Sequence, residues 1–309
     1  MIVGIYVLML MLDPARGDPG TGRFEPSGVA LDMFGAADPI LVRGCGQTWR
    51  LLASMFLHAD LVHLACNAVA LLMLIPIAAG AFGIHRTVCL YFASGLCGAL
   101  LSQWHGSGGV GASGALCGLI GACAAYGRRR GGAFGQELLR RMLGWAACIA
   151  ILGLAVQRID NAGHLGGFLG GAALGWLAAG ARARGGRGDR AWTFAARATV
   201  VSALLVAAVF WAPFILRIFE RRDMDLYWRQ AVRTLSAVAA SLEDGKTADL
   251  PSAFPDGPTG TEGVRDAVRE ALELARRRDP MARDALAQAQ SAFSDWSQSL
   301  LCSHALVPE

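Results

Sequence analysis

The chain has 309 residues, of which 54% are hydrophobic, and its mean hydropathy is +0.42. This composition argues against an ordinary soluble protein and predicts a polytopic membrane protein, in which the 39 glycines suit closely packed helices. The net charge of +4 comes almost entirely from arginines clustered in loops, which indicates membrane topology rather than nucleic-acid binding. The eight cysteines have neither C-x-x-C nor metal-ligand spacing, so we expect small packing residues and no metal site.

Residues 1–12 are apolar, but at about 1.5 Å per residue they cover only about 18 Å of a hydrocarbon core about 30 Å thick. We expect a first transmembrane helix whose start lies upstream of Met1; the alternative is a short, tilted helix. Residues 13–50 are predicted to form a long outer loop. The loop ends in Trp49-Arg50, a pair suited to the headgroup boundary.

Six further apolar segments predict the remaining transmembrane helices. They cover residues 51–79, 87–104, 113–126, 140–156, 162–180 and 198–216. Residues 51–180 would thus hold helices two to six, and residues 181–216 a basic loop followed by a seventh helix. The loops after helices two, four and six carry ten arginines, whereas the loops after helices three and five carry one. The positive-inside rule therefore places the arginine-rich loops in the cytoplasm and the loop of residues 13–50 at the outer face.

Residues 217–309 are soluble in character. Apolar residues recur with helical spacing in three segments, 228–242, 264–275 and 286–300, and the proline-containing residues 250–260 read as a linker. We expect a small helical bundle, or a hairpin on the membrane surface, that serves as a packing or partner surface.

Ser113 follows a glycine-rich loop and opens the helix predicted over residues 113–126. Such a loop can present a hydroxyl and backbone N–H groups at one point, although the packing of small residues between helices explains G-x-S-G alone equally well. His164 opens the helix of residues 162–180 at the same outer level, and histidine is the natural base near neutral pH. The pattern predicts a catalytic dyad, with Ser113 as nucleophile and His164 as general base.

The two helices must approach closely for this pair to meet, which glycines on both would permit. These glycines are Gly114, Gly118 and Gly121 on one helix and Gly167 and Gly171 on the other. His63 and Asn67, four residues apart, would share a helical face and could stabilise an oxyanion together with the N–H of Ser113. His58 is expected to anchor a loop by hydrogen bonding. Asp160 could orient His164, although a carboxylate in a turn is more often simply solvated.

Four motifs in order over residues 46–180 resemble the rhomboid intramembrane serine proteases. They are Trp49-Arg50, His58-x4-His63-Leu-x2-Asn67, Gly111-Ala-Ser113-Gly114 and Asp160-Asn-Ala-Gly-His164-Leu-Gly-Gly167. The resemblance implies an all-α membrane protein with a rhomboid-like six-helix core, here with one extra C-terminal transmembrane helix and a helical soluble tail. It also implies a Ser113–His164 dyad that opens to water from the outer leaflet, with His63, Asn67 and Ser113 around the oxyanion.

The resemblance further implies which partners the protein has. Its substrates would be transmembrane segments of other proteins, cut near the outer face, and no cofactor, metal or nucleotide is expected. We expect a multi-pass protein of a lipid bilayer, in the inner (plasma) membrane of a bacterium. No oligomeric state is predicted.

One residue departs from the family pattern. Cys117 stands where an aromatic side chain often packs on the catalytic imidazole, so His164 would be held less firmly unless another ring, such as that of Phe168, replaces it. Two other functions fit parts of the pattern. The first is a catalytically inactive rhomboid-like protein that binds membrane clients, against which the presence of both Ser113 and His164 argues. The second is a small transporter with a histidine proton relay, which ranks last because no repeated half-structure is present.

Overall fold

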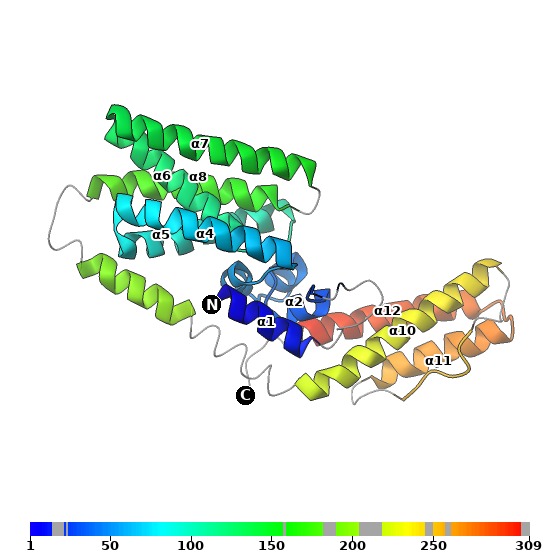
Figure 1. The fold of residues 1–309 in the computed structure, drawn as a ribbon. Coiled ribbons are helices and arrows are strands. Elements are labelled where there is room, and N and C mark those ends of the chain that lie inside the picture. Colours follow the sequence, from blue (N-terminus) through cyan, green and yellow to red (C-terminus); the bar gives the residue numbers. More distant parts are fainter. Residues whose placement is uncertain are drawn as a thin grey trace. The chain divides into compact units, whose positions relative to one another are not determined.

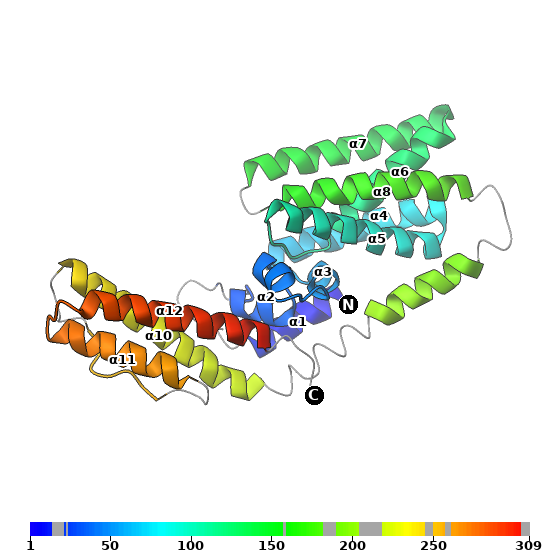
Figure 2. The same cartoon turned by 180° about the vertical axis from the view of Figure 1, so that it is seen from behind.

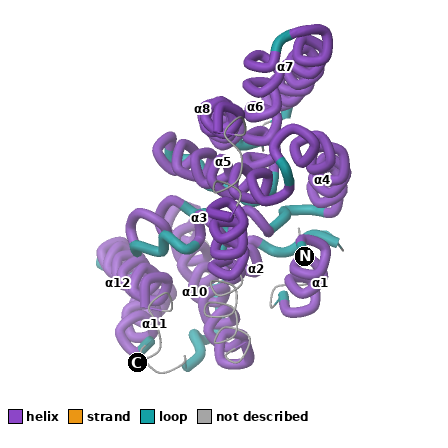
Figure 3. The backbone as a smooth tube through the Cα atoms, turned by 90° about the vertical axis from the view of Figure 1, so that its left-hand side faces the viewer, coloured by secondary structure: helices purple, strands orange, loops and turns teal. Residues whose placement is uncertain are grey.

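The computed structural model describes residues 1–13, 22, 24–156, 159–181, 190–203, 218–244, 250–256 and 261–303. Every regular element in these ranges is a helix, which confirms the prediction of an all-α fold (Figure 3). The chain divides into two compact units, Met1–Ile215 and Leu216–Glu309. Each unit has a hydrophobic core of its own.

The first unit begins with the short helix α1 (Ile2–Leu12) and continues through short elements into five long helices (Figure 1). The short elements are α2 (Gly28–Phe34), a π-helix (Ile40–Gly44), α3 (Arg50–Ala53) and a 3-10 turn (Ser54–Phe56). The long helices are α4 (Leu61–Phe82), α5 (Ile84–His105), α6 (Ser113–Arg130), α7 (Gly132–Ala155) and α8 (Asn161–Ala181). By length and composition, α4, α5 and α7 are long and apolar enough to cross a membrane, whereas α1 is apolar but short.

The predicted start of the second helix at residue 51 is wrong, because α4 begins ten residues later, at Leu61. Asp60 has an extended backbone, and its carboxylate accepts a hydrogen bond from the N–H of His63 at 2.7 Å. This arrangement is an N-cap, which satisfies a donor that the first helical turn leaves unpaired. His58 therefore lies in the bend before α4 and not on the helix.

The predicted start of the fifth helix at residue 140 is also wrong, because α7 begins at Gly132. Arg140 and Arg141 lie about two turns further along on an exposed face, where each makes an ion pair with Glu137 at 2.8 Å. Arginines three and four residues after a glutamate are compatible with a position inside a helix, because these residues are neighbours on the helix surface. The predicted seventh helix lies mostly outside the described residues: residues 190–203 are helical, and residues 204–216 are not described.

The predicted outer loop is partly helical and is held by Arg50, whose side chain is buried (7% exposed). The guanidinium donates hydrogen bonds to the carbonyl oxygens of Asp32 at 2.5 Å and Ala36 at 3.1 Å, and to the side chain of Gln47. It also lies over the ring of Trp49, 4.9 Å from the centroid. One cation thus ties the end of α2 to the start of α3.

Replacing Arg50 with alanine is expected to destabilise the protein by at least about 3 kcal/mol, because hydrogen bonds to charged groups contribute about 1.5–3 kcal/mol each. Lysine at this position should restore only part of the loss, since an ammonium group cannot reproduce the guanidinium fork. Thermal unfolding in detergent measures both effects. Arg43→Ala serves as the control, because Arg43 is exposed in the same loop. Equal melting temperatures for the Arg50→Ala and Arg43→Ala variants would contradict the assignment.

Helix α6 lies at the centre of the unit and contacts α4, α5, α7 and α8 (Figures 1 and 2). Its tightest contact is with α8, where glycines remove the side chains that would separate the backbones. A Cβ on Gly167 would lie 2.0 Å from the carbonyl oxygen of Gly114, and one on Gly171 would lie 1.9 Å from that of Gly118. Because real Cβ atoms do not approach other atoms so closely, this crossing requires glycine at both positions.

The second unit consists of α10 (Ile218–Asp244), α11 (Glu262–Arg276) and α12 (Ala282–Ser303), packed against one another (Figure 2). As predicted, the helices are amphipathic, with Val238, Val268 and Ala289 among the buried side chains. The linker contributes Phe254, whose ring lies 5.2 Å from that of Tyr227 between centroids. Arg269 fixes the linker by donating to the carbonyl oxygen of Phe254 at 2.9 Å.

Candidate active site

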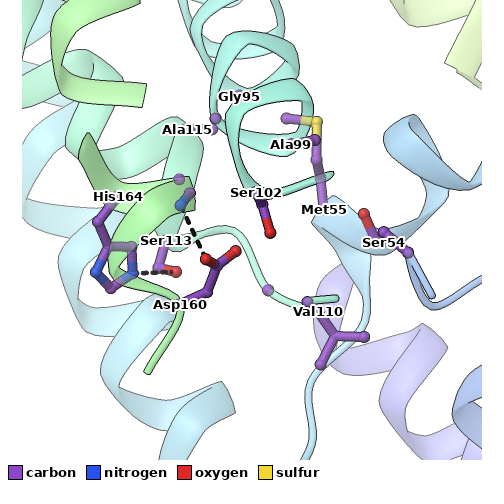
Figure 4. A pocket seen from close by; sticks show the side chains of 16 residues that line it. Ser54, Met55, Gly95, Ala99, Ser102, Val110, Ser113, Ala115, Asp160 and His164 are labelled. Carbon is purple, nitrogen blue, oxygen red and sulfur yellow. Dashed lines mark hydrogen bonds between the residues drawn. The ribbon is translucent and has the colours of Figure 1, made fainter. Parts of the chain in front are cut away.

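Ser113 and His164 lie at the starts of two helices that the glycine contact brings together. Ser113 is the first residue of α6, and His164 lies in the first turn of α8. The Oγ of Ser113 is 2.7 Å from the Nε2 of His164, within hydrogen-bond distance (Figure 4). The structure therefore places together the two residues that the sequence singled out.

The first turn of α8 is organised by Asp160. Its carbonyl oxygen accepts the N–H of His164 at 3.0 Å, and its Oδ1 accepts the N–H of Gly163 at 2.9 Å, as an N-cap does. The carboxylate therefore positions His164 through the helix backbone and not through the imidazole. Within the described ranges, the buried Nδ1 of His164 has no hydrogen-bond partner.

The start of α6 lacks the side-chain cap that α4 and α8 possess. The residue at its N-cap position is Ala112, which offers no side-chain acceptor. The first N–H groups of a helix have no acceptor within the helix, and the positive end of the helix dipole lies there. Donors that a cap would otherwise use are thus left beside the Ser113 hydroxyl, where negative charge would be stabilised.

His63 lies against the loop that precedes Ser113. Gly111 has a φ of +125°, and a Cβ there would lie 2.7 Å from Nε2 of His63 and 3.8 Å from Oγ of Ser113. Glycine is needed both for this backbone conformation and for the close approach of the ring. The N–H of Gly111 donates to the carbonyl oxygen of Ser54 at 2.9 Å, which fixes the loop.

Asn67 and His58 both contact His63. Asn67 is buried (5% exposed), and its Nδ2 donates to the carbonyl oxygen of His63 at 2.9 Å, one turn back on the same helix. His58 is fully buried, and its ring packs edge-on against that of His63 with 5.1 Å between centroids. The pKa of His58 is lowered to about 4, mainly by burial and to a smaller extent by the neighbouring His63, so the ring is neutral at pH 7.

A cavity of about 50 Å³ that water molecules can occupy adjoins the Ser113 hydroxyl. Four predicted site residues line it: Gly111, Ser113, Gly114 and His164. His58, His63, Asn67, Gly167 and Gly171 are not among its lining residues. The predicted site residues thus divide into a group that lines the cavity and a group that does not line it.

The cavity also contains polar groups that sequence reasoning did not connect with the site. These are the hydroxyls of Ser54 and Ser102; the carboxylate of Asp160, which the sequence connected with His164 as a group that could orient it, also lines the cavity (Figure 4). Ser54 and Ser102 lie in segments that were interpreted as apolar spans, where a buried hydroxyl is itself a signal of helix contact or function. Cys117 is buried and does not line the cavity, and Phe168 packs at the edge of the main core.

Comparison with known proteins matches part of this chain to a known domain. Residues 45–181 match the family model described as the Rhomboid domain. The chain is 33% identical over 191 residues to "Rhomboid protease GluP" of Bacillus subtilis (strain 168), a match that covers 59% of this chain and 35% of that protein. It is 35% identical over 178 residues to "RHOMBOID-like protein 1" of Arabidopsis thaliana, covering 53% of this chain and 42% of that protein.

A third relative, "Rhomboid-like protease 3" of Toxoplasma gondii, is 36% identical over 159 residues, which is 49% of this chain and 59% of that protein. The chain thus spans less than two thirds of the length of each of these relatives. The matched range includes the glycine contact, the Ser113–His164 pair and every residue that lines the cavity except Ala37. The protein is an integral membrane protein, and its residues 45–181 form a Rhomboid domain.

Proposed function

We propose that the protein is an intramembrane serine endopeptidase that cleaves transmembrane segments of other membrane proteins near the outer face. The observation that carries the proposal is the 2.7 Å contact between Oγ of Ser113 and Nε2 of His164 beside a water-accessible cavity. Two of the relatives, from Bacillus subtilis and Toxoplasma gondii, have "protease" in their names.

In the proposed reaction, Nε2 of His164 takes the proton of the Ser113 hydroxyl as Oγ attacks a peptide carbonyl carbon. The tetrahedral intermediate collapses when the C–N bond breaks, and the imidazolium returns its proton to the leaving amine. A water molecule, deprotonated by His164, then attacks the acyl-serine ester and releases the new carboxylate. All proton transfers in these steps run between the two side chains, the peptide and water.

Negative charge develops on the carbonyl oxygen during both steps. The uncapped N–H groups at the start of α6 are the main donors we assign to it, with the His63 ring beyond Gly111 as a second donor. Asn67 is assigned a supporting role, because its hydrogen bond to the carbonyl oxygen of His63 steadies the turn that carries the ring. The ring of His58 packs edge-on against the ring of His63, a contact to which we assign the same steadying role.

A fluorophosphonate probe tests whether Ser113 is an activated nucleophile. We expect the folded wild-type protein in detergent to be labelled on Ser113, as identified by mass spectrometry of the modified peptide. The Ser113→Ala variant should remain unlabelled, and His164→Ala should be labelled at least about 100-fold more slowly, because general-base catalysis contributes about 10²–10⁴-fold. Absence of labelling in the folded wild-type protein would favour an inactive, client-binding member of the family.

A further inference from the structure

The carboxylate of Asp160 has one oxygen engaged in the helix cap and another directed elsewhere. Oδ1 accepts the N–H of Gly163 at 2.9 Å. Oδ2 lies on the side of Gly109, 3.1 Å from the position that a Cβ on that residue would occupy. Figure 4 shows the carboxylate between the Ser113–His164 pair and the hydroxyl of Ser102. Asp160 therefore presents an acceptor to the cavity as well as capping α8.

The surroundings of this carboxylate keep the space beside it open. A Cβ on Gly163 would lie 2.4 Å from Oδ2, so a larger residue there would collide with the carboxylate. Gly109 is held in place because its carbonyl oxygen accepts the N–H of Ala37 at 3.2 Å. The loop that carries the cavity wall is thus fixed against the segment that follows α2.

The two hydroxyls in the cavity leave the carboxylate available to a ligand. Ser102 donates to the carbonyl oxygen of Ser107 at 3.3 Å, and Ser54 donates to that of Leu51 at 3.4 Å. With their protons directed to the backbone, both hydroxyls present oxygen lone pairs to the cavity. The cavity is therefore rich in acceptors, and a small group that donates a hydrogen bond fits it best.

We infer that Asp160 is a specificity-determining residue, whose Oδ2 accepts a hydrogen bond from the side chain of the substrate residue whose carbonyl Ser113 attacks. The inference rests on the proposed function. That side chain is attached next to the attacked carbonyl, and the cavity adjoins Ser113, so the cavity is within its reach. The cavity of about 50 Å³ that water molecules can occupy has room for a hydroxymethyl group such as a serine side chain. Serine should thus be preferred to alanine at this position.

The test compares two peptide substrates that differ only in serine or alanine at the residue before the cleaved bond. We expect wild-type protein in detergent to cleave the serine substrate with a kcat/KM about tenfold higher, because the alanine substrate leaves the charged acceptor without a hydrogen bond. The ratio between the two substrates is the quantity of interest, because a general loss of activity cancels in it.

Two variants of Asp160 separate its role in the cavity from its role as a cap. Serine and asparagine are both good N-caps, so Asp160→Ser keeps the helix start but removes Oδ2, and Asp160→Asn replaces it with a neutral amide. We expect the serine-to-alanine ratio to fall to about one in Asp160→Ser, and to lie between that value and the wild-type ratio in Asp160→Asn, because hydrogen bonds to neutral groups are about half as strong. Asp60→Ser is the matched control, since Asp60 caps α4 in the same way but does not line the cavity.

The outcomes distinguish this inference from the function on which it rests. A wild-type ratio near one, or an unchanged ratio in Asp160→Ser, would overturn the role of Asp160 while leaving the protease intact. If Asp160→Ser lowers kcat/KM equally for both substrates, Asp160 acts only as the N-cap of α8. If wild-type protein neither reacts with the fluorophosphonate nor cleaves either substrate, the proposed function fails, and this inference fails with it.

Discussion

Replacing Ser113 with alanine is expected to lower the rate of cleavage of a model transmembrane substrate by about 10⁴-fold or more, because no other group can form the acyl intermediate. The helix should persist, since alanine is well tolerated in the first helical turn and Ser113 does not cap α6. The measurement is the initial rate of cleavage in proteoliposomes. Ser107→Ala is the control, because Ser107 lies in the same glycine-rich loop and its hydroxyl contacts the exposed His105 at 3.1 Å.

A double-variant comparison checks that Ser113 and His164 act as one unit. His164→Ala is expected to lose nearly as much activity as Ser113→Ala, and the double variant should be no slower than Ser113→Ala alone. Residues of a catalytic unit give such non-additive effects, whereas independent residues give additive ones. Additive losses, or substantial cleavage by the Ser113→Ala variant, would contradict the proposed dyad.

Replacing Gly171 with alanine is expected to have the largest effect on the fold. The added Cβ would lie 1.9 Å from the carbonyl oxygen of Gly118, which is backbone and cannot turn aside, so α6 and α8 must separate. We expect a loss of stability of about 3 kcal/mol or more, at the upper end of the range for overpacked sites. Because the same crossing holds Ser113 beside His164, activity should also fall, by about 100-fold for a displacement of 1 Å.

The matched control is Gly144→Ala on α7. A Cβ there would meet nothing within 4 Å, and alanine is favoured over glycine in a helix by about 0.5–1 kcal/mol. Thermal unfolding in detergent should therefore show a strong loss for Gly171→Ala and a small gain or no change for Gly144→Ala. Similar melting temperatures for the two variants would mean that the helix crossing is looser than described.

The sequence predicted the helices best where local signals are strong. The predicted helix of residues 162–180 differs from α8 by one residue at each end, and the fourth predicted helix starts at Ser113, as α6 does. The errors arose where apolar residues continue across a cap. Residues 51–60 are apolar enough to read as helix, but Asp60 starts α4 at Leu61 by binding the N–H of His63. Hydropathy averages over a window and therefore does not detect one capping side chain.

The supporting residues show a second limit of the sequence pattern. The spacing of His63 and Asn67 correctly predicts that they share a helical face, because that follows from the helix period. The pattern does not reveal that Nδ2 of Asn67 donates to the carbonyl oxygen of His63. A polar side chain on a helix can form a hydrogen bond with the backbone of its own helix as well as with a more distant group, and spacing alone does not distinguish the two. For the same reason, the sequence suggests the His164 ring as a partner of Asp160, whereas in the structure the Asp160 carboxylate accepts a hydrogen bond from the N–H of Gly163.

The sequence by itself determined that this is an all-α membrane protein and that Ser113 and His164 are the residues to examine, because apolar composition, helix period and glycine-rich loops act over short stretches of chain. Only the tertiary structure decided that their side chains meet at 2.7 Å, 51 residues apart, and that a cavity with the Asp160 carboxylate adjoins them. Those properties depend on how closely α6 and α8 approach each other. Their separation is set by packing between distant segments, which no local pattern records.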